Sequence, residues 1–136
     1  MDKLAPAQRS ALMGRIRSKD TTPELRVRQM LHRLGYRYVL HDKRLPGKPD
    51  LVFPSRRSVV FVHGCFWHGH DCGRGFRPTS NAVFWATKID GNKARDARHK
   101  ANLKALGWRV LVVWECSTRL NRLTALKRRL VGFLDP

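Results

Sequence analysis

The chain contains 136 residues, of which 28 are Lys or Arg and 10 are Asp or Glu, so its formal net charge is +18. This length fits one domain, because two independent cores would each be only marginally stable. Apolar residues make up 42% of the sequence, enough for a packed core, which excludes charge-driven disorder. No stretch approaches the roughly 18 apolar residues of a membrane span, and the N-terminus lacks the apolar run of a secretory signal. We therefore expect a single soluble domain over residues 1–136, located in the cytoplasm.

The strongly basic balance, with a pI near 11.4, narrows the class of partner. Nucleic acid is favoured, because each neutralised phosphate releases a condensed counterion. An anionic membrane would favour cations gathered on one amphipathic helix face. Here they are spread over the N-terminal quarter, residues 74–104 and residues 119–129. This distribution predicts a surface that wraps around or tracks along a nucleic acid, with no membrane partner.

Two helices are predicted at the start of the chain. The first covers residues 7–17. The second has Thr22-Pro23-Glu24 as N-cap, N1 and N2, then apolar residues at helical spacing up to Leu34, and ends at Gly35.

Strands are predicted after these helices, and a helix, a further strand and a last helix follow an irregular loop. The strands cover 36–40, 50–53 and 59–62, the loop 63–80, the next helix 94–106, the last strand 108–114 and the basic C-terminal helix 122–133. The continuous apolar run at 59–62 indicates a strand buried on both faces. The order α-α-β-β-β-α-β-α predicts an α/β protein of the α+β type, with a mixed sheet flanked by helices.

Two carboxylates occupy unusual positions. Glu24 shares a helix face with Val27 and Leu31, and Asp50 begins an otherwise apolar strand. A carboxylate buried there needs a cation or hydrogen bonds, and hard oxygen ligands suit Mg²⁺. Each also has an ordinary reading: Glu24 completes a capping box with Thr21, and Asp50 is a turn residue. Together, on a basic chain, they favour phosphodiester cleavage.

All three cysteines belong to a second cluster. Thiolate and imidazole are the ligands of tetrahedral zinc sites, and the sequence offers four of them: Cys65, His70, Cys72 and Cys116. A site with four protein ligands has no open position, so this zinc would be structural. The competing reading is buried thiols with surface histidines.

His68 is the candidate catalytic base, because a neutral imidazole can take a proton from an attacking water. It and His63 flank the predicted zinc site, whereas His32, His41 and His99 are assigned to surface or hydrogen-bonded structural roles. Asp96 is the candidate partner that orients His68. Its alternative is a surface ion pair with a neighbouring Arg or Lys.

Aromatic residues lie beside these groups. Phe66 and Trp67 fall in the predicted zinc loop, and Phe84-Trp85 falls between basic segments. Such side chains either wedge between base pairs or form a local core over the zinc, and the sequence leaves both readings open.

Several motifs resemble one known family over nearly the whole chain. They are Arg9-Ser10-x-x-Met13 with Asp20-Thr21 and Glu24, Leu45-Pro46-Gly47-Lys48-Pro49-Asp50, the run Val62-His63-Gly64-Cys65-Phe66-Trp67-His68-Gly69-His70-Asp71-Cys72, Phe84-Trp85, Lys88-Ile89, Asn92-x-x-x-Asp96, and Gly107-Trp108-Arg109-Val110-Leu111-Val112-Val113-Trp114-Glu115-Cys116. The chain resembles the very-short-patch mismatch repair (Vsr) DNA endonucleases, which have a restriction-endonuclease-like fold.

The resemblance implies a Mg²⁺-dependent enzyme that nicks double-stranded DNA 5′ of the mismatched T in a T:G pair, acting as a monomer alongside mismatch-repair proteins. It implies that Asp50 and the Val62 backbone carbonyl bind Mg²⁺, and that residues 1–20 form a DNA-contacting arm. The remaining implied roles are catalysis by His68 with Asp96, outer-shell support by Glu24 and His63, structural Zn²⁺ at Cys65, His70, Cys72 and Cys116, and DNA contact by Met13, Phe66, Trp67, Trp85 and Asn92.

Two alternatives stay open at this point. One is a related nuclease of the same fold with another DNA target. The other is a non-catalytic, zinc-stabilised DNA-binding module, which would bind DNA tightly and yield no Mg²⁺-dependent product.

Overall fold

The computed structural model describes residues 19–72 and 80–136, and the helix expected over 7–17, with Met13, lies outside them. The described elements follow the expected order from the second helix onward. The helices are α2 (Thr22–Arg33), α3 (Ala82–Ala105) and α4 (Leu123–Leu134); the strands are β1 (Val39–Leu40), β2 (Leu51–Phe53), β3 (Ser58–His63) and β4 (Arg109–Trp114); and the short 3₁₀ segments are η1 (Pro54–Arg56), η2 (Glu115–Thr118) and η3 (Leu120–Arg122).

The four strands form one mixed sheet in the order β1-β2-β3-β4. Strand β2 runs antiparallel to β3, with Leu51 opposite Val60, whereas β4 runs parallel to β3, with Leu111 opposite Val60. Helix α3 makes the crossover that this parallel pair requires. Strand β3 is therefore central and, as its apolar run predicted, almost wholly buried.

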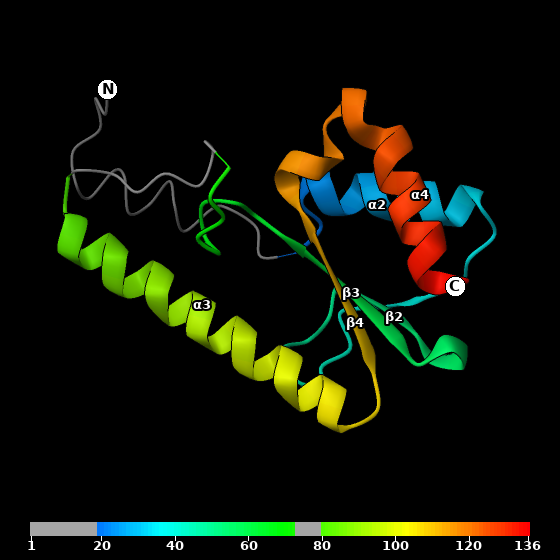
Figure 1. The fold of residues 1–136 in the computed structure, drawn as a ribbon, viewed down its shortest axis with the longest axis horizontal. Helices are drawn as coiled ribbons and strands as arrows, with labels where there is room; N and C mark the ends of the chain where they lie inside the picture. The colour runs from blue at the N-terminus through cyan, green and yellow to red at the C-terminus, as the bar shows by residue number, and fades with distance from the viewer. Residues whose placement is uncertain (1–18, 73–79) are drawn as a thin grey trace.

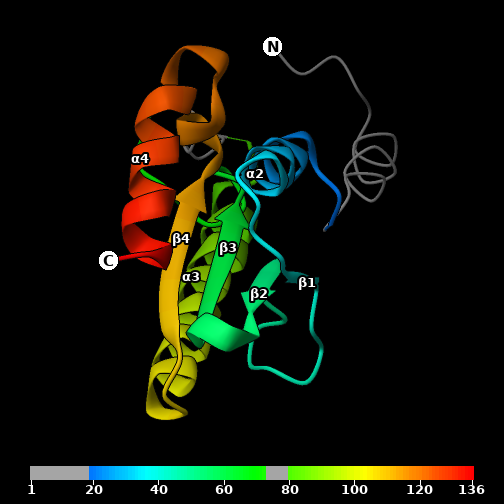
Figure 2. The same cartoon turned by 90° about the vertical axis from the view of Figure 1, so that its right-hand side faces the viewer.

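Helices cover both faces of the sheet (Figures 1 and 2). Alternate strand residues point to opposite faces, which gives two separate cores. One packs Leu51, Phe53, Val60 and Val113 against Val27 and Leu31 of α2 and Leu126, Leu130 and Leu134 of α4. The other packs Val52, Val59 and Phe61 against Leu103 of α3. The expected α+β architecture, a mixed sheet between helical layers, is confirmed.

Helix α2 begins one residue earlier than predicted. Its N-cap is Thr21, whose hydroxyl accepts a hydrogen bond from the Glu24 backbone N–H at 3.3 Å. Gly35 follows the helix with φ +90°, the left-handed conformation that suits glycine after a helix C-terminus. The periodicity was therefore a sound guide, and only the identity of the cap differs.

Two predicted elements differ from the structure by three residues or more at one end. The helix expected over 94–106 begins at Ala82, because the buried side chains of Trp85 and Ile89, one turn apart, anchor its otherwise exposed first half to the protein. The strand expected over 36–40 is reduced to Val39–Leu40. Tyr36 packs edge-on against Phe53 instead, and its hydroxyl contacts Asp135 at 2.5 Å. In the described part of the chain, no helix has the length and apolarity of a membrane span.

Candidate active site

A cleft of about 1190 Å³ opens at one edge of the sheet, between the start of α2, the loop 64–72 and α3. The sheet topology explains why chemical groups meet there. Because β2 and β3 are antiparallel, the start of β2 and the end of β3 lie at the same edge. Asp50 precedes β2 and His63 ends β3, so both side chains line this cleft.

Asp50 has little access to solvent, with 13% of its side chain exposed. Its Oδ2 accepts a hydrogen bond of 2.7 Å from the Val62 backbone N–H. Burial raises the pKa of Asp50 to about 7; the Val62 hydrogen bond opposes this rise, and the nearby Glu24 carboxylate adds to it. A bound cation would compensate the poorly solvated carboxylate, so an oxygen-ligated divalent ion fits this position.

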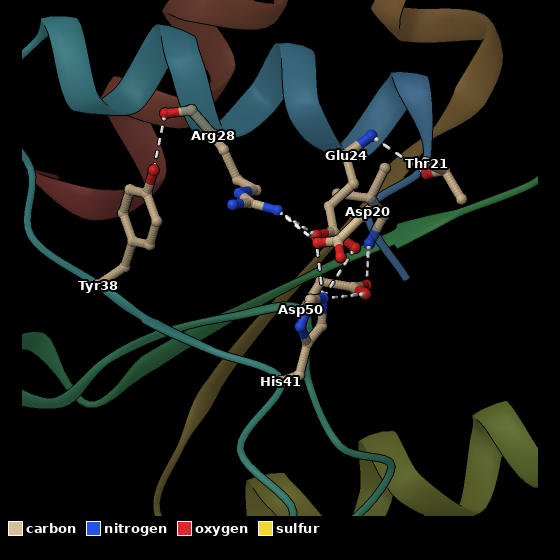
Figure 3. Close-up of polar contacts among 8 residues, drawn as sticks. Asp20, Thr21, Glu24, Arg28, Tyr38, His41 and Asp50 are labelled. Atoms are coloured by element: carbon tan, nitrogen blue, oxygen red, sulfur yellow. Dashed lines mark hydrogen bonds and ion pairs between the residues drawn. The ribbon is translucent and has the colours of Figure 1, made fainter. Parts of the chain in front are cut away.

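Glu24 lies beside Asp50 and is 1% exposed (Figure 3). The cap at Thr21 involves the backbone N–H of Glu24. The Glu24 carboxylate lies 2.9 and 3.0 Å from His41 Nε2 and accepts a hydrogen bond of 3.2 Å from Arg28. Thr21 therefore caps the helix, while the Glu24 side chain is turned to His41 and Arg28 and does not complete a capping box.

His68 and Asp96 are brought together from segments 28 residues apart, with Nδ1 of the imidazole 2.5 Å from Oδ2 of the carboxylate. The imidazole stacks on His63, with ring centroids 3.8 Å apart and planes within 3°. Burial, followed by repulsion from His68, lowers the pKa of His63 to about 4. His63 is therefore neutral at neutral pH and presents a flat uncharged face to His68.

The predicted zinc ligands also converge. Ligand atoms of Cys65, His70, Cys72 and Cys116 all lie within 4.8 Å of one another, and His70 Nδ1 is 3.7 Å from the Cys116 Sγ. Burial raises the pKa of the Cys65 thiol to about 12, so a metal must displace its proton. Three sulfurs and one imidazole suit zinc in a closed tetrahedral site. Such an ion would join the loop 64–72 to η2, directly after β4.

The aromatic residues form a cluster at the start of α3. The rings of Phe66, Trp67 and Phe84 lie 5.3, 5.9 and 5.0 Å from that of Trp85. Trp85 is only 6% exposed, whereas Phe84 is 58% exposed. Trp85 is thus the buried member of the cluster and contacts the other three rings. Asn92 fixes the same loop, because its side-chain amide donates to the Trp67 carbonyl at 2.9 Å.

Two residues that line the cleft were not singled out by reasoning from sequence. His41, assigned to the ordinary histidines, lies in the cleft and contacts Glu24. Glu115 accepts a hydrogen bond of 3.2 Å from the Cys65 backbone N–H, and its position next to Cys116 was the available signal. Basic residues also line the cleft, a composition suited to phosphates; they are Lys48, Lys88, Lys93, Arg95 and Lys100.

Comparisons with known proteins agree with this geometry. Residues 1–74 match the family model described as DNA mismatch endonuclease Vsr. The chain is 56% identical over 135 residues to the type II nicking enzyme V.XorIIP of Xanthomonas oryzae pv. oryzae, covering 99% of this chain and 98% of that protein. It is 44% identical over 113 residues to the DNA mismatch endonuclease Vsr of Escherichia coli K12, covering 83% of this chain and 72% of that protein.

Among solved structures, the catalytic domain of the homing endonuclease I-Bth0305I superposes with a TM-score of 0.56 at 21% identity, covering 84% of this chain and 94% of that one. This likeness confirms the nuclease-type fold. The family model and the relatives, which are named as mismatch or nicking endonucleases, establish the family. The chain therefore belongs to the Vsr family of endonucleases.

Proposed function

We propose that this endonuclease nicks one strand of double-stranded DNA 5′ of the mismatched T in T:G pairs that arise by deamination of 5-methylcytosine, and so initiates very-short-patch repair. One observation carries the proposal: Asp50 and the His68–Asp96 pair line a single cleft with a basic lining. One chain holds one such set of groups, so a monomer suffices to cut one strand.

Asp50 and the Val62 backbone carbonyl are the proposed Mg²⁺ ligands. Mg²⁺ bound there would stabilise charge on the scissile phosphate. Glu24, held close by in the buried network, would accept hydrogen bonds from waters around the ion. The buried, acceptor-rich environment of Asp50 is the observation that fits a hard cation.

His68 is the proposed general base. Asp96 contacts its Nδ1 and fixes the ring orientation, which leaves Nε2 as the nitrogen that takes a proton from water. His63 stacks on the same ring and limits its rotation.

The cysteine cluster is proposed to bind structural Zn²⁺, and the aromatic cluster to recognise the mismatch. Phe66 and Trp67, supported by Trp85, would stack beside a T:G wobble pair, which unstacks at lower cost than a matched pair. Asn92 would hold their loop and contact the DNA, and Met13 would approach from the N-terminal arm, residues 1–20.

A nicking assay tests the function directly. Three labelled duplexes differ only in a T:G, a T:A or a C:G pair within a candidate methylation site, and each is incubated with and without Mg²⁺. We expect one cut 5′ of the mismatched T, only with Mg²⁺. Equal cutting of all three would indicate a nuclease of this fold with another target, and binding without any cut would indicate a DNA-binding module.

The variant Asp50→Asn separates cutting from binding. Because a metal ion supplies several kcal/mol of transition-state stabilisation, we expect the rate of nicking to fall by about 10³-fold or more. DNA affinity, measured by fluorescence anisotropy, should stay close to that of the wild type. Full activity in the folded variant would refute the assignment of Asp50.

A further inference from the structure

His41 lies beside the carboxylates of Glu24 and Asp50. Its Nε2 is 2.9 and 3.0 Å from the two oxygens of Glu24 and 3.9 Å from Oδ1 of Asp50 (Figure 3). Only 14% of the side chain is exposed. In the described part of the chain, the neighbours of Nε2 at these distances are carboxylate oxygens, so Nε2 acts as the hydrogen-bond donor to Glu24.

The backbone of the same residue is tied to Asp50. The His41 N–H donates to the Asp50 carbonyl at 3.1 Å, directly after the β1–β2 pairing of Leu40 with Leu51. His41 also adopts φ +49°, a left-handed conformation that costs a non-glycine residue about 1–2 kcal/mol. One residue therefore holds Asp50 through its main chain and Glu24 through its side chain.

Glu24 needs such support because it is 1% exposed and belongs to another element. On its other side, Arg28 donates to Oε2 at 3.2 Å and to Asp20 at 2.7 Å. Arg28 belongs to α2, like Glu24, and carries no link to Asp50 in the described network. His41 contacts both Glu24 of α2 and Asp50, which precedes β2 (Figure 3), and so adds a donor to the direct interaction between these two carboxyl groups.

We propose that His41 is a positioning residue, which fixes the Glu24 carboxylate relative to Asp50 and thereby sets the affinity of the cleft for a divalent cation. The proposal rests on the proposed role of Asp50 as a cation ligand. Groups that orient metal ligands through hydrogen bonds commonly change metal affinity by about 10- to 100-fold when they are removed.

Three substitutions isolate the hydrogen bond from the shape of the side chain. In His41→Gln, the side-chain amide places a donor near the position of Nε2. His41→Asn carries the same amide on a shorter stem that falls short of Glu24, and His41→Leu removes the donor. The exposed histidine of α2 supplies the control variant, His32→Leu. Circular dichroism confirms that each variant is folded.

The probe is Mn²⁺, followed by electron paramagnetic resonance in the absence of DNA, after the cysteine cluster has been saturated with Zn²⁺. We expect His41→Leu and His41→Asn to weaken Mn²⁺ binding by about 10- to 100-fold, and His41→Gln and His32→Leu to bind like the wild type. If His41→Leu unfolds, His41→Asn gives the same comparison. Wild-type affinity in His41→Asn or His41→Leu overturns the proposal, and so does equal weakening in folded His41→Gln.

The Mn²⁺ measurement separates this inference from the proposed function. Loss of Mn²⁺ binding in Asp50→Asn establishes the cation site without any DNA substrate. A wild-type protein that binds Mn²⁺ there but cuts no T:G duplex refutes the proposed function alone, and the role of His41 is still decided by its variants. Retained Mn²⁺ binding in Asp50→Asn overturns the inference, because the cation then lies elsewhere.

Discussion

Cys72→Ala removes one thiolate from the proposed zinc site while disturbing the core little, since Cys72 is only partly buried, unlike the fully buried Cys65. An alanine supplies no ligand, and three ligands cannot close a tetrahedral site. The loop 64–72 contains no helix or strand. A bound metal would add links to η2 beyond the hydrogen bond from Cys65 to Glu115, and we expect Cys72→Ala to lose zinc and stability together.

The size of the effect follows from linkage. Free zinc at 1,000 times its dissociation constant stabilises the folded state by about 4 kcal/mol. For a domain of this length, each kcal/mol shifts Tm by roughly 3–5 °C, so loss of the site should lower Tm by about 12–20 °C. Such a loss is a large part of the roughly 5–15 kcal/mol that stabilises a typical domain.

The assay combines metal analysis with thermal unfolding. Mass spectrometry of the purified protein should give one zinc per chain for the wild type and none for Cys72→Ala. Circular dichroism should show that a zinc chelator lowers the Tm of the wild type towards that of the variant, while the variant itself hardly responds. The matched control is Asp71→Ala, which changes the exposed neighbouring residue in the same loop and should keep both zinc and Tm.

Two results would contradict this reasoning. One is a Cys72→Ala protein that retains one zinc per chain. The other is a metal-free variant with the Tm of the zinc-loaded wild type, which would show that the four side chains are held together by packing alone.

Three further substitutions test the core, the pH response and the loop. Leu103→Ala, in the core beneath α3, should cost about 2–5 kcal/mol in urea unfolding, whereas Leu106→Ala, at a residue 55% exposed, should stay within about 0.5 kcal/mol. Burial lowers the pKa of His63 from 6.5 to about 4, so between these values the unfolded chain binds more protons and the free energy of unfolding falls as pH falls. His63→Phe should remove up to about 3 kcal/mol of that loss, and equal pH profiles would refute it. Gly69→Ala would place a Cβ 2.6 Å from an α3 side chain at φ +65° and should slow nicking by about 10²-fold; Gly91→Ala, in open space, should leave the rate unchanged and add about 1 kcal/mol.

Local signals in the sequence were enough for the elements and groups that depend on neighbouring residues. Pro23 and the apolar periodicity located α2, and the apolar run after Gly107 located β4. Four soft ligands, including every cysteine, marked a candidate metal cluster, which the structure brings together. The first half of α3 was missed, because Gly91 and its polar neighbours interrupt the pattern that Trp85 and Ile89 begin.

The residue types of the site were readable in the sequence. Burying a carboxylate beside an apolar strand costs free energy unless a cation or hydrogen bonds compensate it, and a cysteine–histidine run supplies zinc ligands. Their geometry was decided by the tertiary structure. The antiparallel β2–β3 pair brings Asp50 to the backbone of Val62, and the crossover helix brings Asp96 to His68. His41 gave no local signal at all, because its partner Glu24 lies 17 residues away and meets it only when α2 packs on the sheet. Sequence patterns report what each segment buries, whereas contacts between segments exist only after the sheet has set their register.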